Sequence, residues 1–328
     1  MNLTELAKKL DVSASTISRV LNDKPGISQA TRDKVLAAVK AEGFSLNCSA
    51  RNLAKSETNF IGVIARKRGL AQDEALFHHS LAQFQEIFLK NNFIVIPLSY
   101  RDKKVDFAST PLSPSDFAGF IIRGQSIPSR VILSIQQYQV PYILLENDLQ
   151  EIKVNTVICN DMEAEYELVS HLIKKGCRRI IHVTGPADWY NDRQRLIGYQ
   201  KAMAEAKLPE EVYNEPDTTL QNGADCFLRI KLKKNEKTGI AFVNDAMALG
   251  YIDAAMRGGY VIPDDVSVTG FDDIPWAKLT KPALTTSQIC IEQMCRLTAR
   301  RLLDMINNPE EEPVKMIVPC CLKVRETT

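Results

Sequence analysis

Polar side chains follow four separate apolar runs in the later part of the chain, at positions where they could bind a small polar molecule. Arg123 follows GFII, Glu146 follows ILL, Asn244 and Asp245 follow IAFV, and Asp272 and Asp273 follow VTGF. A carboxylate such as that of Asp272 can accept hydrogen bonds from two adjacent hydroxyl groups, as a sugar site requires. Arg123 would favour an acidic or phosphorylated ligand, unless it is a solvated charge on the rim of the site.

Apolar runs alternate with helical patterns from residue 59 onward, and this alternation positions the polar groups. Strands are expected at 60–66, 93–100, 118–124, 140–147, 178–185, 238–245 and 266–273, and helices at 75–92, 161–175, 192–206 and 246–259. Alternating strands and helices predict parallel sheets covered on both faces. Two such sets, at residues 60–158 and 160–288, predict two α/β lobes with a cleft between them. Ligands of open parallel sheets bind at the carboxyl ends of strands, where these polar groups lie.

The beginning of the chain shows a different pattern, that of three short helices. Leu3, Leu6, Ala7 and Leu10 recur at helical spacing, Ser13 and Ser28 can cap a second and a third helix, and Ile17, Val20, Leu21, Val35, Leu36 and Val39 would face inward. This arrangement is typical of the helix-turn-helix of DNA-binding proteins, although a plain three-helix bundle would give the same pattern. Residues 1–58 carry nine Lys and Arg against six Asp and Glu, whereas the whole chain has a net charge of +1. The basic N-terminal segment modestly favours a nucleic-acid partner.

Composition and motifs argue against several other classes of protein. The 328 residues are 45% hydrophobic and 25% charged, as in globular proteins, and no apolar run is long enough to span a membrane. The first residues lack the apolar stretch of a signal peptide, and the eight cysteines form no CxxC pair, which favours reduced thiols in the cytoplasm. The patterns GxGxxG, GxxxxGKS/T, GxSxG and HExxH are absent. We therefore expect neither an enzyme nor a bound metal or other cofactor.

Longer motifs carry a family resemblance that covers essentially the whole chain. VSASTISRVLN, ISQATRDKVLAA and GFSLNCSARNLA closely resemble the N-terminal segments of lactose-repressor (LacI/GalR) family transcription regulators. HLIKKGCRRIIHVTGP, RLIGYQKAM, FVNDAMALG, DVSVTGFDDIP and PALTTSQ resemble that family's effector domain, which is similar to periplasmic sugar-binding proteins. The resemblance implies an N-terminal all-α helix-turn-helix domain and a two-lobed α/β effector domain with parallel sheets. One departure is Leu46, which stands where the family usually has a proline.

On the DNA side, the resemblance implies contacts with bases, phosphates and the minor groove. Ala14, Ser15 and Arg19 would face base edges in the major groove. Contacts with phosphates would come from Asn2, Thr4, Ser13, Thr16, Ser18, Asn22, Ser28 and Thr31. A hinge segment containing Asn47, Arg51 and Leu53 would fold on DNA, and Leu53 would wedge into a base step of the minor groove. The alternative is a flexible linker with Leu53 buried in the next domain.

On the effector side, the resemblance assigns Arg195, Asn244 and Asp272 to the cleft by their motif positions. The planar donor fork of Arg195 suits ring hydroxyls or a carboxylate. Glu146 and Arg123 also align with pocket positions of the family, and Trp276 and Trp189 could either stack on a sugar face or serve only in packing. Asp272 and Asp273 could instead be helix caps at a strand end, and Asp245 is expected to cap the helix that follows it.

These observations predict a ligand-responsive, sequence-specific DNA-binding transcription regulator, namely a repressor of carbohydrate uptake or catabolism. Residues 1–46 would form the helix-turn-helix domain, 47–58 the hinge, and 59–328 the effector-binding and dimerisation domain, with one lobe at 59–159 plus 290–320 and the other at 160–289 plus 321–328. The expected partners are pseudo-palindromic double-stranded operator DNA, a sugar or sugar derivative, and a second copy of the chain, in the cytoplasm. The alternatives are a regulator that senses a nucleobase or a phosphorylated compound and, more distantly, a solute-binding protein with no role in transcription.

Overall fold

In a computed structural model the chain forms two compact units, residues 1–58 and 59–328. The structure describes residues 7, 9–10, 12–21, 26–41, 59–66, 71–101, 104–149, 152–232, 237–308 and 312–328. No helix in this part of the chain is long and apolar enough to cross a membrane. Several positions assigned above lie outside the described residues, namely Asn2, Thr4, Asn22, Leu46, Asn47, Arg51 and Leu53, together with the side chains of Ala14, Ser15 and Ser18.

The N-terminal unit contains helix α2 (Ala14–Leu21) and helix α3 (Gln29–Ala41), preceded by helical residues at positions 7, 9 and 10. Both helices begin after a serine that caps them. The Ser13 hydroxyl accepts a hydrogen bond from the Thr16 backbone N–H at 3.0 Å, and the Ser28 hydroxyl accepts one from that of Thr31 at 3.3 Å. The buried core of the unit consists of Ala7, Leu10, Ile17, Val20 and Val35. These caps and this core agree with the helical pattern of the sequence.

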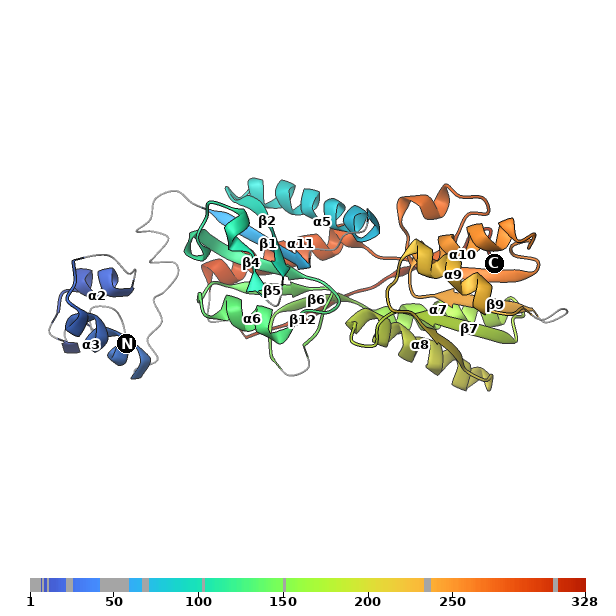
Figure 1. Ribbon diagram of the computed structural model, residues 1–328, viewed down its shortest axis with the longest axis horizontal. Coiled ribbons are helices and arrows are strands. Elements are labelled where there is room, and N and C mark those ends of the chain that lie inside the picture. The colour runs from blue at the N-terminus through green and yellow to red at the C-terminus, as the bar shows by residue number, and fades with distance from the viewer. Residues whose placement is uncertain are drawn as a thin grey trace. The chain divides into compact units, whose positions relative to one another are not determined.

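The first lobe of the larger unit is a seven-stranded sheet between two layers of helices (Figure 1). The strand order is β12-β6-β5-β4-β1-β2-β3, with β1 at Phe60–Arg66, β2 at Ile94–Arg101, β3 at Lys104–Val105, β4 at Phe117–Arg123, β5 at Tyr142–Leu145, β6 at Thr156–Cys159 and β12 at Lys315–Val318. Neighbouring strands are parallel except β2 and β3. Helices α5 (Ala71–Leu89) and α11 (Ile291–Asn307) cover one face, and α6 (Ser129–Gln136) covers the other. Short 3-10 turns lie at Phe107–Ser109 and Pro114–Asp116.

The second lobe is a six-stranded sheet in the order β13-β11-β10-β9-β7-β8. Its strands are β7 (Arg179–Thr184), β8 (Glu211–Asn214), β9 (Thr238–Phe242), β10 (Val266–Asp272), β11 (Thr285–Gln288) and β13 (Cys321–Lys323), and β13 alone is antiparallel to its neighbour. Helices α9 (Leu220–Arg229) and α10 (Asp245–Arg257) pack on one face. The other face is covered by α7 (Asp161–Lys174) and α8 (Tyr190–Ala206), and a 3-10 turn lies at Pro275–Lys278. Figure 1 shows these two helix layers on opposite sides of the sheet.

The chain passes between the two lobes three times, at β6–α7, β11–α11 and β12–β13 (Figure 1). Helix α11 and strand β12 therefore complete the first lobe before β13 returns to the second. Contacts between the lobes include a hydrogen bond from the Ser126 hydroxyl to Asp188 at 2.8 Å and one from the Tyr190 backbone N–H to the Gln125 carbonyl at 3.0 Å. Such a connection through a few short segments permits the lobes to change their relative angle.

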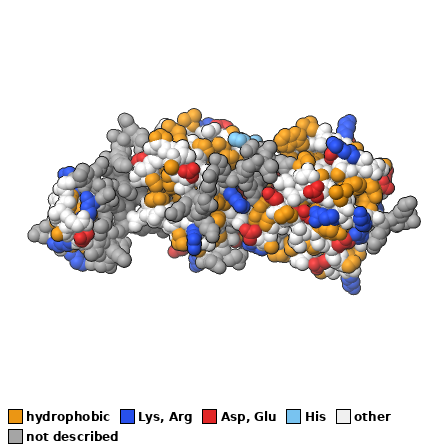
Figure 2. All heavy atoms as spheres, in the orientation of Figure 1, with side chains coloured by type: hydrophobic (Ala, Val, Ile, Leu, Met, Phe, Trp, Pro, Cys, Tyr) orange, Lys and Arg blue, Asp and Glu red, His pale blue; other side chains and the backbone are white. Residues whose placement is uncertain are grey.

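Charged side chains of both signs are interspersed over the second lobe on the face that Figure 2 shows, with apolar side chains between them. This distribution agrees with the near-neutral charge of the chain, +1 overall. That face of the lobe thus presents no single-sign field of the kind that attracts a polyanion.

Candidate functional site

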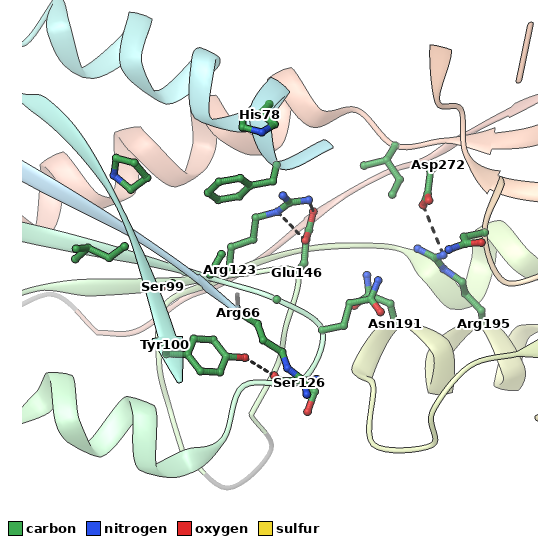
Figure 3. Close-up of a pocket in the computed structure, with 18 of the residues that line it drawn as sticks. Arg66, His78, Ser99, Tyr100, Arg123, Ser126, Glu146, Asn191, Arg195 and Asp272 are labelled. Carbon is green, nitrogen blue, oxygen red and sulfur yellow. Dashed lines mark hydrogen bonds and ion pairs between the residues drawn. The ribbon is translucent and has the colours of Figure 1, made fainter. Parts of the chain in front are cut away.

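A cavity of about 380 Å³ lies between the two lobes (Figure 3). The first lobe contributes Arg66, Tyr100, Arg123 and Glu146 to its wall, and the second lobe contributes Asn191, Arg195, Asn244 and Asp272. Most of these residues stand at the carboxyl ends of parallel strands, as the topological rule requires. No group of three His, Cys, Asp or Glu side chains that could hold a metal ion occurs in the described ranges. The wall of the cavity thus combines charged side chains with hydrogen-bonding groups from both lobes.

Arg123 and Glu146 form a bidentate ion pair on the wall of the first lobe. Nε of Arg123 donates to Oε2 of Glu146 at 2.9 Å, and Nη2 donates to Oε1 at 2.8 Å. Both side chains are about nine-tenths buried, with 10% and 12% of their surfaces exposed. The alternative that Arg123 is a solvated rim charge is therefore wrong. Glu146 largely neutralises the positive charge of Arg123 within the protein. Arg123 therefore gives little reason to expect an acidic ligand.

Arg195 is the most buried charged group in the wall of the second lobe, with 1% of its surface exposed. It projects from α8, and its Nε and Nη2 lie 2.9 Å and 2.8 Å from the same Oδ1 of Asp161. Its guanidinium carbon lies 3.6 Å from the centre of the Phe271 ring. Asp161 and Phe271 therefore fix the plane of the donor fork before any ligand arrives.

Asp272 and Arg195 lie side by side in the cavity wall, where one ligand atom can reach both. Oδ1 of Asp272 lies 3.6 Å from Nη1 of Arg195, which is too long for a hydrogen bond, and Figure 3 shows the two side chains pointing toward one another. Burial raises the pKa of Asp272 well above its usual range, while the charge of Arg195 opposes that rise. A ligand hydroxyl could donate to Asp272 and accept from Arg195 at the same time.

The two acids of the cavity wall share an unusual backbone conformation. Glu146 has φ +66° and Asp272 has φ +113°, a region that residues other than glycine rarely adopt. Each lies at the end of a strand, where this conformation directs the carboxylate toward the cavity. Backbone strain of this kind occurs preferentially at ligand sites.

Asn244 both lines the cavity and caps α10. Its side-chain oxygen accepts the Met247 backbone N–H at 2.9 Å, and its amide donates to the Thr218 carbonyl at 2.9 Å. The expectation that Asp245 caps this helix is therefore wrong. Asp245 is the first helical residue and is fully buried, where it accepts hydrogen bonds from the Thr286 hydroxyl and the Ile274 backbone N–H. Asp273 caps no helix either, because its carboxylate binds Arg325 at 2.6 Å.

The structure brings neither tryptophan to the cavity. Trp189 precedes α8 and is 4% exposed, and Trp276 lies in the turn Pro275–Lys278 with half of its surface exposed. Neither side chain belongs to the cavity wall. The aromatic groups that do line it are Phe77 and Tyr100, and the Tyr100 hydroxyl donates to the Ser126 carbonyl at 2.9 Å.

Sequence reasoning missed Arg66, His78, Tyr100, Ser126 and Asn191 in the cavity wall. Two of them had a detectable signal, because Arg66 ends the run FIGVIAR and Tyr100 ends FIVIPLSY. The strand-end rule that found Arg123 would have found these two as well. His78 and Asn191 lie on helices, where no comparable signal marks them.

The N-terminal unit presents hydroxyl groups at the starts of α2 and α3. The Ser13 and Thr16 hydroxyls are 2.8 Å apart, and so are those of Ser28 and Thr31. Arg19 lies exposed on α2. Helix starts of this kind attract phosphate oxygens, because free N–H groups and the helix dipole both favour an anion there. The described part of the unit thus has the form of a helix-turn-helix with polar groups at both helix starts.

Two protein-family models match the chain. Residues 2–47 match the bacterial regulatory proteins of the lacI family, and residues 169–328 match the periplasmic binding protein-like domain. Among curated relatives, the probable HTH-type transcriptional repressor ExuR of Bacillus subtilis (strain 168) is 26% identical over 330 residues, which cover 100% of this chain and 98% of that protein. The HTH-type transcriptional repressor PurR of Shigella sonnei (strain Ss046) is 27% identical over 318 residues, which cover 95% and 92%.

Solved structures share the fold of the whole chain. A lac repressor dimer bound to operator and the anti-inducer ONPF superimposes with a TM-score of 0.70 at 24% identity, covering 100% of this chain and 99% of that one. The complex of the transcriptional regulator CelR with cellobiose gives a TM-score of 0.72 at 23% identity and covers 100% of both chains. The predicted fold class, a helix-turn-helix domain followed by a two-lobed α/β domain, is confirmed.

The fold and the family matches together define a class, that of regulators which join a helix-turn-helix to a binding-protein-like domain. The chain has a lacI-family helix-turn-helix domain followed by a periplasmic binding protein-like domain, and it is a DNA-binding transcription regulator. The curated relatives named above are HTH-type transcriptional repressors.

Proposed function

We propose that this chain is a repressor that binds operator DNA as a homodimer and changes its affinity for that DNA when a sugar or sugar derivative occupies the inter-lobe cavity. The observation that carries the proposal is the cavity itself, which receives polar groups from both lobes of a chain whose other unit is a lacI-type DNA-binding domain. Its volume of about 380 Å³ suits a small ligand. The target genes would serve carbohydrate uptake or catabolism.

The chemistry of the second lobe supports a sugar over a flat, apolar ligand. Asp272, Asn244 and Asn191 offer oxygens and amides, while neither tryptophan reaches the cavity. Solved relatives of the same fold include CelR in complex with cellobiose and an Enterococcus faecium regulator with bound ribose, at a TM-score of 0.72 each. A role as a solute-binding protein alone does not account for the lacI-type N-terminal domain.

The proposed mechanism is thermodynamic linkage between the cavity and the DNA-binding unit. A ligand that contacts Arg195 and Asp272 in one lobe and Glu146 and Tyr100 in the other favours one angle between the lobes. The three crossovers join the two lobes of each chain. In the dimer, the angle between these lobes therefore sets the position of one chain's first lobe relative to that of the other chain. We propose that the spacing of the two segments 47–58 follows, and with it the stability of the Leu53 wedge in the minor groove.

On DNA, we propose that α2 enters the major groove. Ala14, Ser15 and Arg19 would read base edges, while hydroxyls at both helix starts, including Ser13 and Ser28, would hold phosphates. Thr4, Thr16, Ser18, Asn22 and Thr31 would add phosphate contacts, and Asn47 and Arg51 would belong to the DNA-bound hinge. A two-fold symmetric dimer would read a pseudo-palindrome. A protein that reads chromosomal DNA would act in the cytoplasm.

The test combines operator selection with a ligand screen. Genomic fragments bound by the purified full-length protein are selected and footprinted, and we expect two symmetric half-sites. Neutral and anionic sugars are then added to the protein–operator complex, and the change in affinity gives the sign of the response. Binding without sequence preference would contradict the proposal of a specific operator. If no sugar or sugar derivative alters the affinity for the operator, the proposed effector class is wrong.

A further inference from the structure

The walls that the two lobes contribute to the cavity differ in charge. The first-lobe wall has two arginines, Arg66 and Arg123, and one acid, Glu146. The second-lobe wall has Arg195 with Asp272, and Asp161 lies directly behind Arg195. The first wall therefore carries an excess positive charge, whereas on the second wall Asp161 balances Arg195, and burial raises the pKa of Asp272. A cavity with this polarity orients any ligand that carries a charge at one end.

The excess positive charge is located at Arg66. Arg123 is neutralised by its bidentate pair with Glu146, whereas no ion pair within the described ranges involves Arg66. Arg66 is the last residue of β1, opposite Tyr100 in the strand register, and its side chain is exposed. In Figure 3 it extends toward the side of the cavity on which Tyr100 and Ser126 lie.

A ligand that fills the cavity would take water away from the Arg66 guanidinium. Withdrawing water from a charge without supplying a counter-charge is costly. An anionic group on the ligand supplies that counter-charge and gains a charge-assisted hydrogen bond. The second wall offers less to an anion, because Asp161 already balances the charge of Arg195 and the Asp272 side chain lies beside it.

We propose that the effector is an anionic monosaccharide, whose carboxylate or phosphate binds Arg66 on the first lobe and whose hydroxyls bind Asp272 and Asn244 on the second. This inference rests on the proposed function and narrows its ligand class. Such a ligand spans both lobes along the direction of the cavity's own polarity. Its anion engages one lobe and its hydroxyls engage the other, so that binding is coupled to the angle between them.

The test is calorimetric titration of the full-length protein with matched pairs of ligands. The pairs are galacturonate with galactose, glucuronate with glucose, glucose 6-phosphate with glucose, and ribose 5-phosphate with ribose. We expect at least one acid to bind roughly 10-fold to 100-fold more tightly than its neutral parent, as one charge-assisted contact provides. Comparison of the uronates with the sugar phosphates shows whether the site prefers a carboxylate or a phosphate.

Three variants assign that preference to Arg66. Arg66→Gln should bring the affinity ratio of acid to neutral sugar close to one, and Arg66→Lys should restore part of it. Arg130→Gln is the matched control, because Arg130 is an exposed arginine of the same lobe that lies outside the cavity wall. It removes the same charge and should leave the ratio unchanged. Thermal midpoints of all three variants verify that they fold.

Three outcomes overturn the inference. Neutral sugars that bind as tightly as their acids and alter operator affinity would refute the anionic ligand and leave the proposed sugar-responsive repressor standing. A preference for acids that survives in Arg66→Gln and falls in Arg130→Gln would refute the role of Arg66. If no member of any pair changes operator affinity, both the inference and the proposed effector class are contradicted.

Discussion

Arg195 and Asp161 form a buried ion pair at the edge of the inter-lobe cavity, with Nε and Nη2 at 2.9 Å and 2.8 Å from one carboxylate oxygen. The two side chains are 2% and 1% exposed. Because Asp161 begins α7 and Arg195 lies on α8, the pair also joins the two helices that cover one face of the second sheet. The arginine that the family motif assigns to the ligand is therefore part of the internal structure of the lobe.

Asp161→Asn should destabilise the larger unit strongly. The substitution leaves the Arg195 guanidinium buried without its main counter-charge, which costs about 3–5 kcal/mol. The measurement is the free energy of unfolding by chemical denaturation. The control is Asp253→Asn, which breaks a solvent-exposed pair with Arg257 and should change stability by no more than about 0.5 kcal/mol. Similar losses of unfolding free energy in both variants would show that burial of the Arg195–Asp161 pair contributes no additional stability.

Stability should fall as the pH rises from 5 to 8, because two buried acids favour their protonated forms in the folded protein. Burial raises the pKa of Asp245 to about 7 and that of Asp161 to about 6, although hydrogen bonds to Asp245 and the charge of Arg195 beside Asp161 oppose the rise. In the unfolded chain both lie near 4, so the folded state binds more protons between these values. The stabilisation is complete below about pH 4 and is lost as the pH passes the folded pKa values.

Asp245→Asn tests this pH dependence. The amide is uncharged at every pH and can still occupy the site between Thr286 and Ile274. Denaturation at a series of pH values should show a smaller loss of stability between pH 5 and pH 8 than in the unmodified protein, by up to about 2 kcal/mol. An unchanged pH profile in the variant would mean that Asp245 is ionised throughout this range.

The strand-end rule located much of the cavity because it depends on a feature that is local in sequence. Arg123, Glu146 and Asp272 each follow a buried apolar strand, and the carboxyl ends of parallel strands meet at one edge. Asp161 carries no such signal, because its role depends on the packing of α7 against α8. The placement of Trp189 and Trp276 depends on the path of loops, which the sequence pattern does not determine.

The ends of strands and helices are likewise predictable where the sequence carries a local apolar run. The run FIGVIAR was predicted as a strand at 60–66, and β1 has those bounds, because its residues are apolar and mostly buried. Strand β8 and helix α9 were not predicted. β8 is an edge strand whose four residues are half-buried or exposed, so its sequence EVYN contains no apolar run. The expected cap of α10 is Asp245, and the observed cap is Asn244, one residue earlier. Only the hydrogen bonds reveal this difference.

Asp272→Asn should weaken effector binding by about 10-fold or more and leave operator binding intact. The amide keeps the size of the side chain but replaces one accepting oxygen with an NH2 donor, so that fewer ligand hydroxyls can donate to it. Calorimetry with the effector found in the screen gives the affinity, and a mobility shift gives operator binding. Trp276→Ala, at an exposed residue outside the cavity wall, should leave the affinity for the effector unchanged. Equal losses in the two variants would argue against a direct contact between Asp272 and the ligand.

Leu53→Ala should reduce affinity for the operator far more than affinity for non-specific DNA. An apolar wedge gains its energy from a base step that the specific sequence allows to unstack, whereas non-specific binding depends mainly on phosphate contacts. Both affinities must be measured at the same salt concentration, because the phosphate term changes steeply with salt. Arg19→Gln gives a useful comparison, since loss of a base contact in the major groove should relax sequence preference without changing the bend of the DNA. If Leu53→Ala lowers both affinities by the same factor, the leucine is not a wedge, and its place is in the packing of the linker.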